Sequence, residues 1–146
     1  MITKAIKNAF RIAKERNWDR TFWAFDIHAT MIKPNYDAGN VPTEFYPHAI
    51  ETLQLISNRK DVDMILWTCS HPHEIDQYIK IFEAEGITFK FVNENPDVPT
   101  QGGGYGCYDR KFYMNVVFED KAGFDADEDW EKVLDLVKNT PEYLGN

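Results

Sequence analysis

Cysteine and long apolar stretches are both scarce in this sequence. Two cysteines, Cys69 and Cys107, are too few for a disulfide framework, which favours a reducing, cytoplasmic location. No apolar run approaches the roughly 20 residues that a membrane-spanning helix needs. The first residues, MITKAIKNAF, lack the apolar core and the small-residue cleavage site of a signal peptide. We therefore expect a cytoplasmic protein that does not enter a membrane.

Positive charge is scarce beyond the first 20 residues. That segment holds six Lys/Arg and two Asp/Glu, which gives it a net charge of +4. The rest of the chain carries −12, and the total is −8. An acidic body argues against nucleic acid as a partner, because nucleic-acid binding depends on basic surface. The basic start is expected to be a solvated helix face, with contact to a phosphate-bearing partner as the alternative.

Length and apolar patterning predict one globular domain over residues 1–146. The chain is 43% hydrophobic and 14% aromatic, enough apolar material for a packed core. Residues 1–17 form an amphipathic helix that packs on this domain, because their apolar side chains recur at helical spacing. The apolar residues of that stripe are Ile2, Ala5, Ile6, Ala9, Ile12 and Ala13.

Strand and helix patterns alternate along the rest of the chain. Short apolar runs predict strands at residues 21–25, 62–67, 89–92 and 113–118. Helical spacing predicts helices at residues 47–59, at 72–85 with Gly86 as a cap, and from Trp130 to a stop at Pro141. This order indicates an α/β protein, a three-layer α/β/α sandwich whose central sheet is mainly parallel and covered on both faces.

Chemically useful side chains follow the predicted strands. They are Asp26 and His28 after the first strand, Thr68 after the second, Lys111 just before the fourth, and Glu119 and Asp120 after it. The carboxyl ends of parallel strands meet at one edge of a sheet, where ligands bind in open α/β folds. We expect these groups to form one site.

The residue types suit metal-assisted phosphoryl transfer. Asp26 would attack phosphorus and form an aspartyl-phosphate, and Thr68 would donate a hydrogen bond to the phosphate. Lys111 would neutralise phosphate charge, and Mg²⁺ would take oxygen ligands from carboxylates, phosphate and water. A zinc site at Cys69, His71, His73 and Cys107 is the alternative metal site, although this spacing is not that of a known finger.

Over residues 21–139 the chain resembles the haloacid-dehalogenase-like (HAD) superfamily. The matching motifs are FWAFDIHAT, ILWTCS and RKFYMNVVFEDKA, and EGITFKFVNENP resembles a small capless bacterial and phage subgroup. The resemblance implies a Rossmann-like sheet without a cap domain. It makes Asp26 the nucleophile and a Mg²⁺ ligand, together with the backbone carbonyl of His28 and with Asp120. It assigns phosphate binding to Thr68 and Lys111, with Glu119, Asp125 and Thr30 around the ligands, and leaves open which of the acids Glu119, Asp120 and Asp125 binds directly.

His28 departs from this family pattern. Family phosphatases carry an aspartate there, which protonates the leaving oxygen and then activates water, whereas members that cleave carbon–halogen or phosphonate bonds lack it. Histidine can act as a general acid or base, although a nearby Mg²⁺ disfavours its protonated form. The main hypothesis is a Mg²⁺-dependent phosphohydrolase. The alternative is a catalytically degenerate module that binds phosphate and metal.

The motif spacing also bears on the substrate. One helix and loops fill the sequence between Thr30 and Thr68, and likewise between Thr68 and Lys111. This leaves no room for a folded cap. By family anatomy, an open site suits a large or extended phosphorylated substrate, or it is covered by a partner such as a second copy of the chain.

Overall fold

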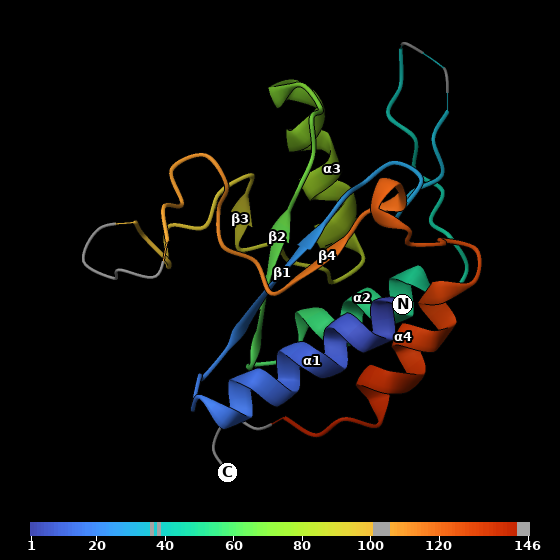
Figure 1. Cartoon of the computed structure of the whole chain (residues 1–146). Coiled ribbons are helices and arrows are strands. Elements are labelled where there is room, and N and C mark those ends of the chain that lie inside the picture. The colour runs from blue at the N-terminus through green and yellow to red at the C-terminus, as the bar shows by residue number, and fades with distance from the viewer. Residues whose placement is uncertain (36, 38, 101–105, 143–146) are drawn as a thin grey trace.

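A four-stranded parallel sheet lies at the centre of the computed structural model, which describes residues 1–35, 37, 39–100 and 106–142 (Figure 1). The strands are β1 (Thr21–Phe25), β2 (Val62–Leu66), β3 (Phe91–Val92) and β4 (Val116–Phe118), in the spatial order β3-β2-β1-β4. Every residue of β1 is buried, as expected for a central strand that has a neighbour on each side.

The helices all pack on one face of this sheet. They are α1 (Ile2–Glu15), α2 (Ala49–Ser57), α3 (Pro72–Ala84) and α4 (Asp129–Lys138), and a short 3₁₀ turn, η1 (Asp120–Ala122), follows β4. Figure 1 shows α1, α2 and α4 gathered together. Buried side chains of the four helices share one core with Trp23 and Phe25 of β1. The connections from β1 to β2 and from β2 to β3 step in the same direction, so right-handed crossovers place α2 and α3 on the same face.

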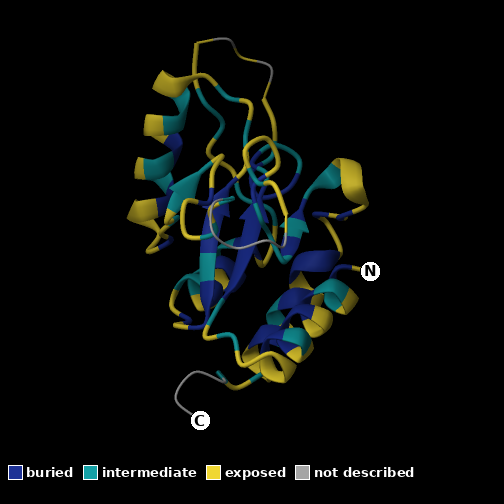
Figure 2. Ribbon diagram, turned by 60° about the vertical axis from the view of Figure 1, so that its left-hand side comes forward, coloured by how far each residue is buried: buried dark blue, intermediate teal, exposed yellow. Residues whose placement is uncertain are grey.

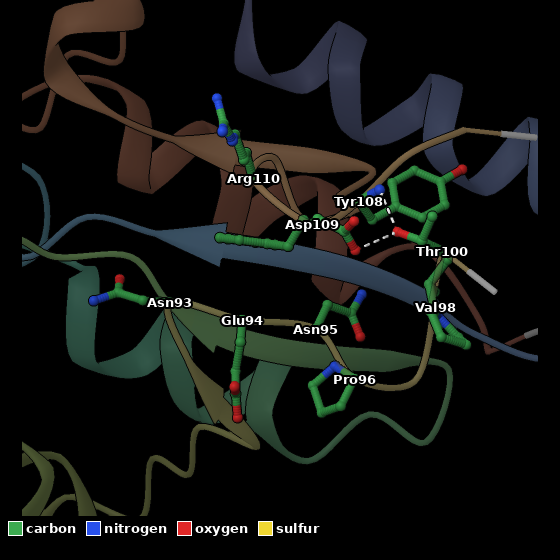
Figure 3. A pocket seen from close by; sticks show the side chains of 11 residues that line it. Asn93, Glu94, Asn95, Pro96, Val98, Thr100, Tyr108, Asp109 and Arg110 are labelled. Atoms are coloured by element: carbon green, nitrogen blue, oxygen red, sulfur yellow. Dashed lines mark hydrogen bonds between the residues drawn. The ribbon is translucent and has the colours of Figure 1, made fainter.

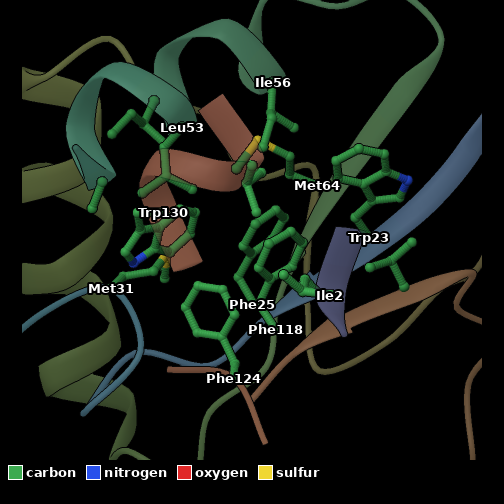
Figure 4. Close-up of a cluster of buried hydrophobic side chains, with 14 of the residues drawn as sticks. Ile2, Trp23, Phe25, Met31, Leu53, Ile56, Met64, Phe118, Phe124 and Trp130 are labelled. Carbon is green, nitrogen blue, oxygen red and sulfur yellow. The ribbon is translucent and has the colours of Figure 1, made fainter. Parts of the chain in front are cut away.

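Stacked aromatic rings form the centre of this core (Figure 4). Phe25 stacks on Phe118 with ring centroids 4.4 Å apart, and Phe118 stacks on Trp130 of α4 at 5.5 Å. Offset stacking of this kind adds about 0.5–1.5 kcal/mol per pair beyond the area that it buries. The stack therefore joins β1, β4 and α4 directly below the ends of the two strands.

The second face of the sheet is covered by the connection from β3 to β4. Phe22 and Ala24 of β1 and Ile65 of β2 form a smaller core there with Phe112, and Val98 and Tyr113 pack around it. Figure 2 shows the strands buried between these layers. The predicted Rossmann-like α/β sandwich with a parallel sheet is confirmed, and in the described residues its third layer is this connection.

Three predicted strands are shorter in the structure, β2 by one residue at its end, and helix α2 begins later. The strand expected at residues 113–118 begins at Val116. The N–H of Asn115 still donates to the Phe22 carbonyl at 2.7 Å, but the Phe22 N–H is accepted by the side-chain Oδ1 of Asn115, at 2.7 Å, rather than by a backbone carbonyl. The strand expected at 89–92 contains only residues 91–92. Helix α2 begins at Ala49, after Pro47, since His48 takes a left-handed conformation with φ +68°.

Candidate functional site

Strands β1 and β4 end side by side, and this brings three carboxylates together. Phe25 pairs with Phe118 in the parallel register, and the N–H of Asp26 donates to the carbonyl oxygen of Phe118 at 2.9 Å. Glu119 and Asp120 follow at once. One carboxylate oxygen each from Asp26, Glu119 and Asp120 lies within 4.8 Å of the others. The predicted meeting of these residues at the strand ends is therefore present in the structure.

Thr30 hydrogen-bonds to two residues of this carboxylate cluster. The chain folds back after β1 because the N–H groups of residues 30, 31 and 32 all donate to the carbonyl of Ile27, at 3.3, 2.9 and 3.0 Å. The fully buried Thr30 then donates its hydroxyl to Asp26 Oδ2 at 3.0 Å and accepts the N–H of Asp120 at 3.2 Å. Trp130 donates its indole N–H to the Thr30 carbonyl at 2.8 Å, which fixes the turn to α4.

Burial and crowding shift the pKa values of the cluster. Burial raises the pKa of Asp26, and the hydrogen bond from Thr30 opposes that rise in part. Burial, together with the neighbouring Asp120 and Asp26, raises the pKa of Glu119 to about 7. Burial also acts to raise the pKa of Asp120, but hydrogen bonds with Glu119 and Asp26 outweigh it and lower the pKa overall. At neutral pH the cluster therefore concentrates negative charge.

The raised pKa of Glu119 predicts a pH dependence of stability. As pH rises from 4.5 towards 7, the unfolded chain loses this proton before the folded protein does, so the free energy of unfolding falls and stays lower above pH 7. We expect Glu119→Gln to flatten this fall, measured as melting temperature against pH without metal. Glu83→Gln, at an exposed position of α3, is the matched control. An unchanged slope in Glu119→Gln would contradict the assignment.

The carboxylate cluster has the donor chemistry of a site for a hard cation. Mg²⁺ prefers oxygen ligands and is commonly held by one or two carboxylates. Asp26, Glu119 and Asp120 supply three carboxylates at one point, and a bound cation would offset the repulsion that raises the pKa values of Asp26 and Glu119. The residues present therefore fit Mg²⁺.

His28 is held against helix α3. Its Nε2 shares a hydrogen bond of 2.6 Å with the hydroxyl of Tyr78, and the two rings meet edge to face at 5.5 Å. Tyr78 is 1% exposed, and burial with nearby Glu74 raises its pKa to about 12, so the phenol keeps its proton at neutral pH. Sequence reasoning missed this partner, since Tyr78 showed only the helical spacing of a core residue.

Thr68 follows β2 and is fixed by a residue that the sequence analysis did not single out. Asn93, directly after β3, accepts the Thr68 N–H at 2.8 Å and donates to the Thr68 carbonyl at 2.7 Å. The Thr68 hydroxyl bonds to Ser70 at 2.8 Å. Asn93 is left-handed, with φ +55°, a conformation that asparagine tolerates better than most residues. Its place at a strand end was the only signal in the sequence.

The structure places Lys111 and Asp125 outside the carboxylate cluster. Lys111 is exposed and adjoins Phe112, whose ring contacts that of Trp67, just after β2, at 5.3 Å. Lys121, rather than Lys111, contributes to the lowered pKa of Asp120. Asp125 belongs to the turn before α4, where its Oδ1 accepts the N–H of Asp127 at 3.0 Å.

The alternative zinc residues do not gather into a comparable group. Cys69 and Cys107 are exposed, and the rings of His71 and His73 stack on each other at 5.8 Å at the start of α3. In the part of the chain that the structure describes, the carboxylate cluster is the one group of three or more potential metal-ligating side chains.

Comparisons with known proteins support only the fold of this chain. No protein-family model and no curated protein matches the chain. A solved structure of a conserved protein from Bacteroides thetaiotaomicron is similar, with a TM-score of 0.62 and 24% identity, and the match covers 82% of this chain and 90% of the other. None of the described helices is both long and apolar enough to cross a membrane.

Proposed function

We propose that this protein is a Mg²⁺-dependent phosphohydrolase whose nucleophile is Asp26. The observation that carries the proposal is the carboxylate cluster at the strand ends, in which Thr30 holds both Asp26 and the backbone of Asp120. A half-buried carboxylate with fixed orientation, beside two further acids, suits attack on a phosphorus atom whose charge a cation offsets. The motif resemblance to the HAD superfamily supports the same chemistry.

Each residue then has a defined role. The hydrogen bond from Thr30 to Oδ2 orients the Asp26 carboxylate, and Oδ1 attacks the phosphorus while the bond from phosphorus to the leaving oxygen breaks. Thr68 and Lys111 bind the phosphate oxygens. Water then hydrolyses the aspartyl-phosphate, which releases phosphate and restores Asp26. Mg²⁺, held by Asp26, Asp120 and the His28 carbonyl with Glu119 beside them, would supply charge neutralisation for the phosphate.

His28 is the proton donor in this proposal. Its Nε2 is engaged with the Tyr78 hydroxyl at 2.6 Å, so Nδ1 is the atom that gives a proton to the leaving oxygen and later takes one from water. Tyr78 acts as a positioning residue, because its buried hydroxyl holds the ring in one orientation. An acid must first lie within hydrogen-bond reach of the leaving oxygen before its pKa can matter.

The hydrogen bond between His28 and Tyr78 also favours a second candidate function, that of a module that binds phosphate and metal without turnover. A histidine ring held by α3 has less freedom to reach a leaving oxygen than the aspartate of family phosphatases. In this case Thr68, Lys111 and the carboxylate cluster would still bind a phosphorylated ligand, and the chemical step would be lost with the acid.

One experiment separates the two candidates. Phosphate release from a panel of phosphomonoesters is measured between pH 5 and 9 for the wild type, His28→Asn and His28→Asp, with Mg²⁺ and after EDTA. We expect Mg²⁺-dependent release by the wild type and a roughly 10²-fold loss in His28→Asn, the size of the general-acid contribution that an amide cannot make. Release only by His28→Asp would instead establish the binding module, and no release by any of the three proteins would overturn the phosphohydrolase.

A further inference from the structure

A small pocket lies beside the proposed phosphate site, on the helix-free face of the sheet. It has a volume of about 310 Å³, is open to solvent on one side, and is lined by residues 93–96, 98–100, 108–110 and 112 (Figure 3). Two of its residues connect it to the end of β2: Asn93 holds the backbone of Thr68, and the ring of Phe112 contacts that of Trp67. A group that leaves a phosphate bound at Thr68 therefore has this pocket next to it.

The polar lining of the pocket includes Glu94, Asn95 and Asp109. The Asp109 carboxylate already accepts the Thr100 hydroxyl at 2.9 Å (Figure 3). Asn95 is 6% exposed, and although its Nδ2 donates to the Tyr113 carbonyl at 2.9 Å, its buried Oδ1 has no hydrogen-bond partner in the described residues. Buried polar atoms are nearly always paired, so this oxygen lacks a donor in the wall of the pocket.

Two charged side chains at the rim complete the chemistry. Glu94 and Arg110 are exposed and form no ion pair with another described residue, and Figure 3 shows them on opposite sides of the pocket. A carboxylate accepts two hydroxyl donors and a guanidinium donates to hydroxyl oxygens. With two acids and one base in its lining, the pocket does not favour a second phosphate.

The apolar part of the lining and the volume limit the size of the occupant. Tyr108 and Phe112 contribute aromatic rings, against which the C–H face of a sugar ring can pack. Ligand sites commonly span about 300–1,000 Å³, so 310 Å³ is at the small end and fits a single ring rather than an extended chain.

We infer that this pocket binds the leaving group of the substrate, and that this group is a polyhydroxylated unit of monosaccharide size, so that the substrate class is a sugar phosphate. The inference rests on the proposed phosphohydrolase activity. It deepens that proposal because hydroxyl groups supply donors to Glu94 and Asn95, while Arg110 donates to the hydroxyl oxygens.

The test compares kcat/KM for a hexose 6-phosphate with that for p-nitrophenyl phosphate, which has no hydroxyl groups, and with that for O-phosphoserine. We expect the hexose phosphate to be favoured over both by at least roughly tenfold, because an unpaired buried acceptor such as that of Asn95 discriminates against a partner without hydroxyl donors. Glu94→Gln and Arg110→Ala should each lower the selectivity ratio, which is kcat/KM for the hexose phosphate divided by kcat/KM for p-nitrophenyl phosphate, by roughly fivefold to tenfold. The matched controls are Glu131→Gln and Lys138→Ala, both exposed on α4, and these should leave the ratio unchanged.

Calorimetric binding separates failure of the pocket from failure of the phosphohydrolase. Hexose 6-phosphate and inorganic phosphate are titrated into the wild type and both pocket variants with Mg²⁺. Tighter binding of the hexose phosphate, lost in the variants, supports the pocket even if no substrate is turned over. Equal binding of the two ligands, a preference for O-phosphoserine, or a selectivity ratio unaffected by the variants overturns it, even if phosphate release is vigorous.

Discussion

Replacing Asp26 with asparagine is expected to lower phosphate release by roughly 10³-fold or more, because an amide oxygen does not form the acyl-phosphate. Asparagine keeps the shape of the side chain and still accepts the hydrogen bond from Thr30. In the wild type, acid quenching during turnover should leave a phosphoryl group on Asp26, detected by mass spectrometry of the peptide. The same peptide from Asp26→Asn should carry none.

Two further measurements make this result specific to the nucleophile. Asp76→Asn, at an exposed position on α3, should retain wild-type activity. Asp26→Asn should melt at or above the wild-type temperature at pH 8 without metal, because burial disfavours the charged form of Asp26 and the substitution removes that charge. Wild-type turnover in Asp26→Asn would rule out the nucleophile. If Asp26→Asn loses turnover but wild-type Asp26 carries no phosphoryl group after acid quenching, the role of Asp26 is restricted to binding.

Replacing Trp130 with alanine is expected to cost about 3–5 kcal/mol of unfolding free energy, the range for truncation of a large buried aromatic side chain. Trp130 is 1% exposed and stacks on Phe118 with an interplanar angle of 5°. The loss would be measured by urea denaturation. The exposed Leu55 of α2 provides the control, because Leu55→Ala at the surface should change stability by about 0.5 kcal/mol or less.

Trp130→Phe tests whether this core residue also supports the site. Phenylalanine keeps an aromatic ring in the stack and removes the indole N–H that bonds to the Thr30 carbonyl. An unpaired buried carbonyl costs about 1–3 kcal/mol, and the freed turn should lower kcat through the misplaced Thr30 hydroxyl. A Trp130→Ala loss below about 1 kcal/mol would contradict the packing argument. A fully active Trp130→Phe would restrict Trp130 to stability.

Most of the helices, the strands and the location of the carboxylate cluster could be predicted from the sequence. Local patterns carry this information, since apolar runs and helical spacing depend only on near neighbours. Once the sheet is taken as parallel, residues that follow β1 and β4 must share one edge. Asp26, Glu119 and Asp120 meet there for that reason. The ends of the short strands β3 and β4 were less predictable, because Asn115 replaces part of a strand ladder with a side-chain bond.

The tertiary structure alone decided how the residues that flank the cluster are held. Tyr78 reaches His28 across 50 positions of sequence, and Asn93 reaches Thr68 across 25. Such pairs depend on how α3 and β3 dock on the sheet, and no local pattern encodes that geometry. The placement of α2 and α3 on the same face likewise follows from strand order, which periodicity does not reveal.

The opening stretch at residues 21–30 therefore combines both kinds of information. Its composition determined a buried strand that ends in Asp26, because apolar residues pair in the sheet and the carboxylate must lie beyond it. Only the folded chain brought Thr30 back onto Asp26 and placed His28 against Tyr78. The tight turn after β1 is formed by hydrogen bonds to the Ile27 carbonyl, and it is fixed to α4 by Trp130, a residue 100 positions away in the sequence.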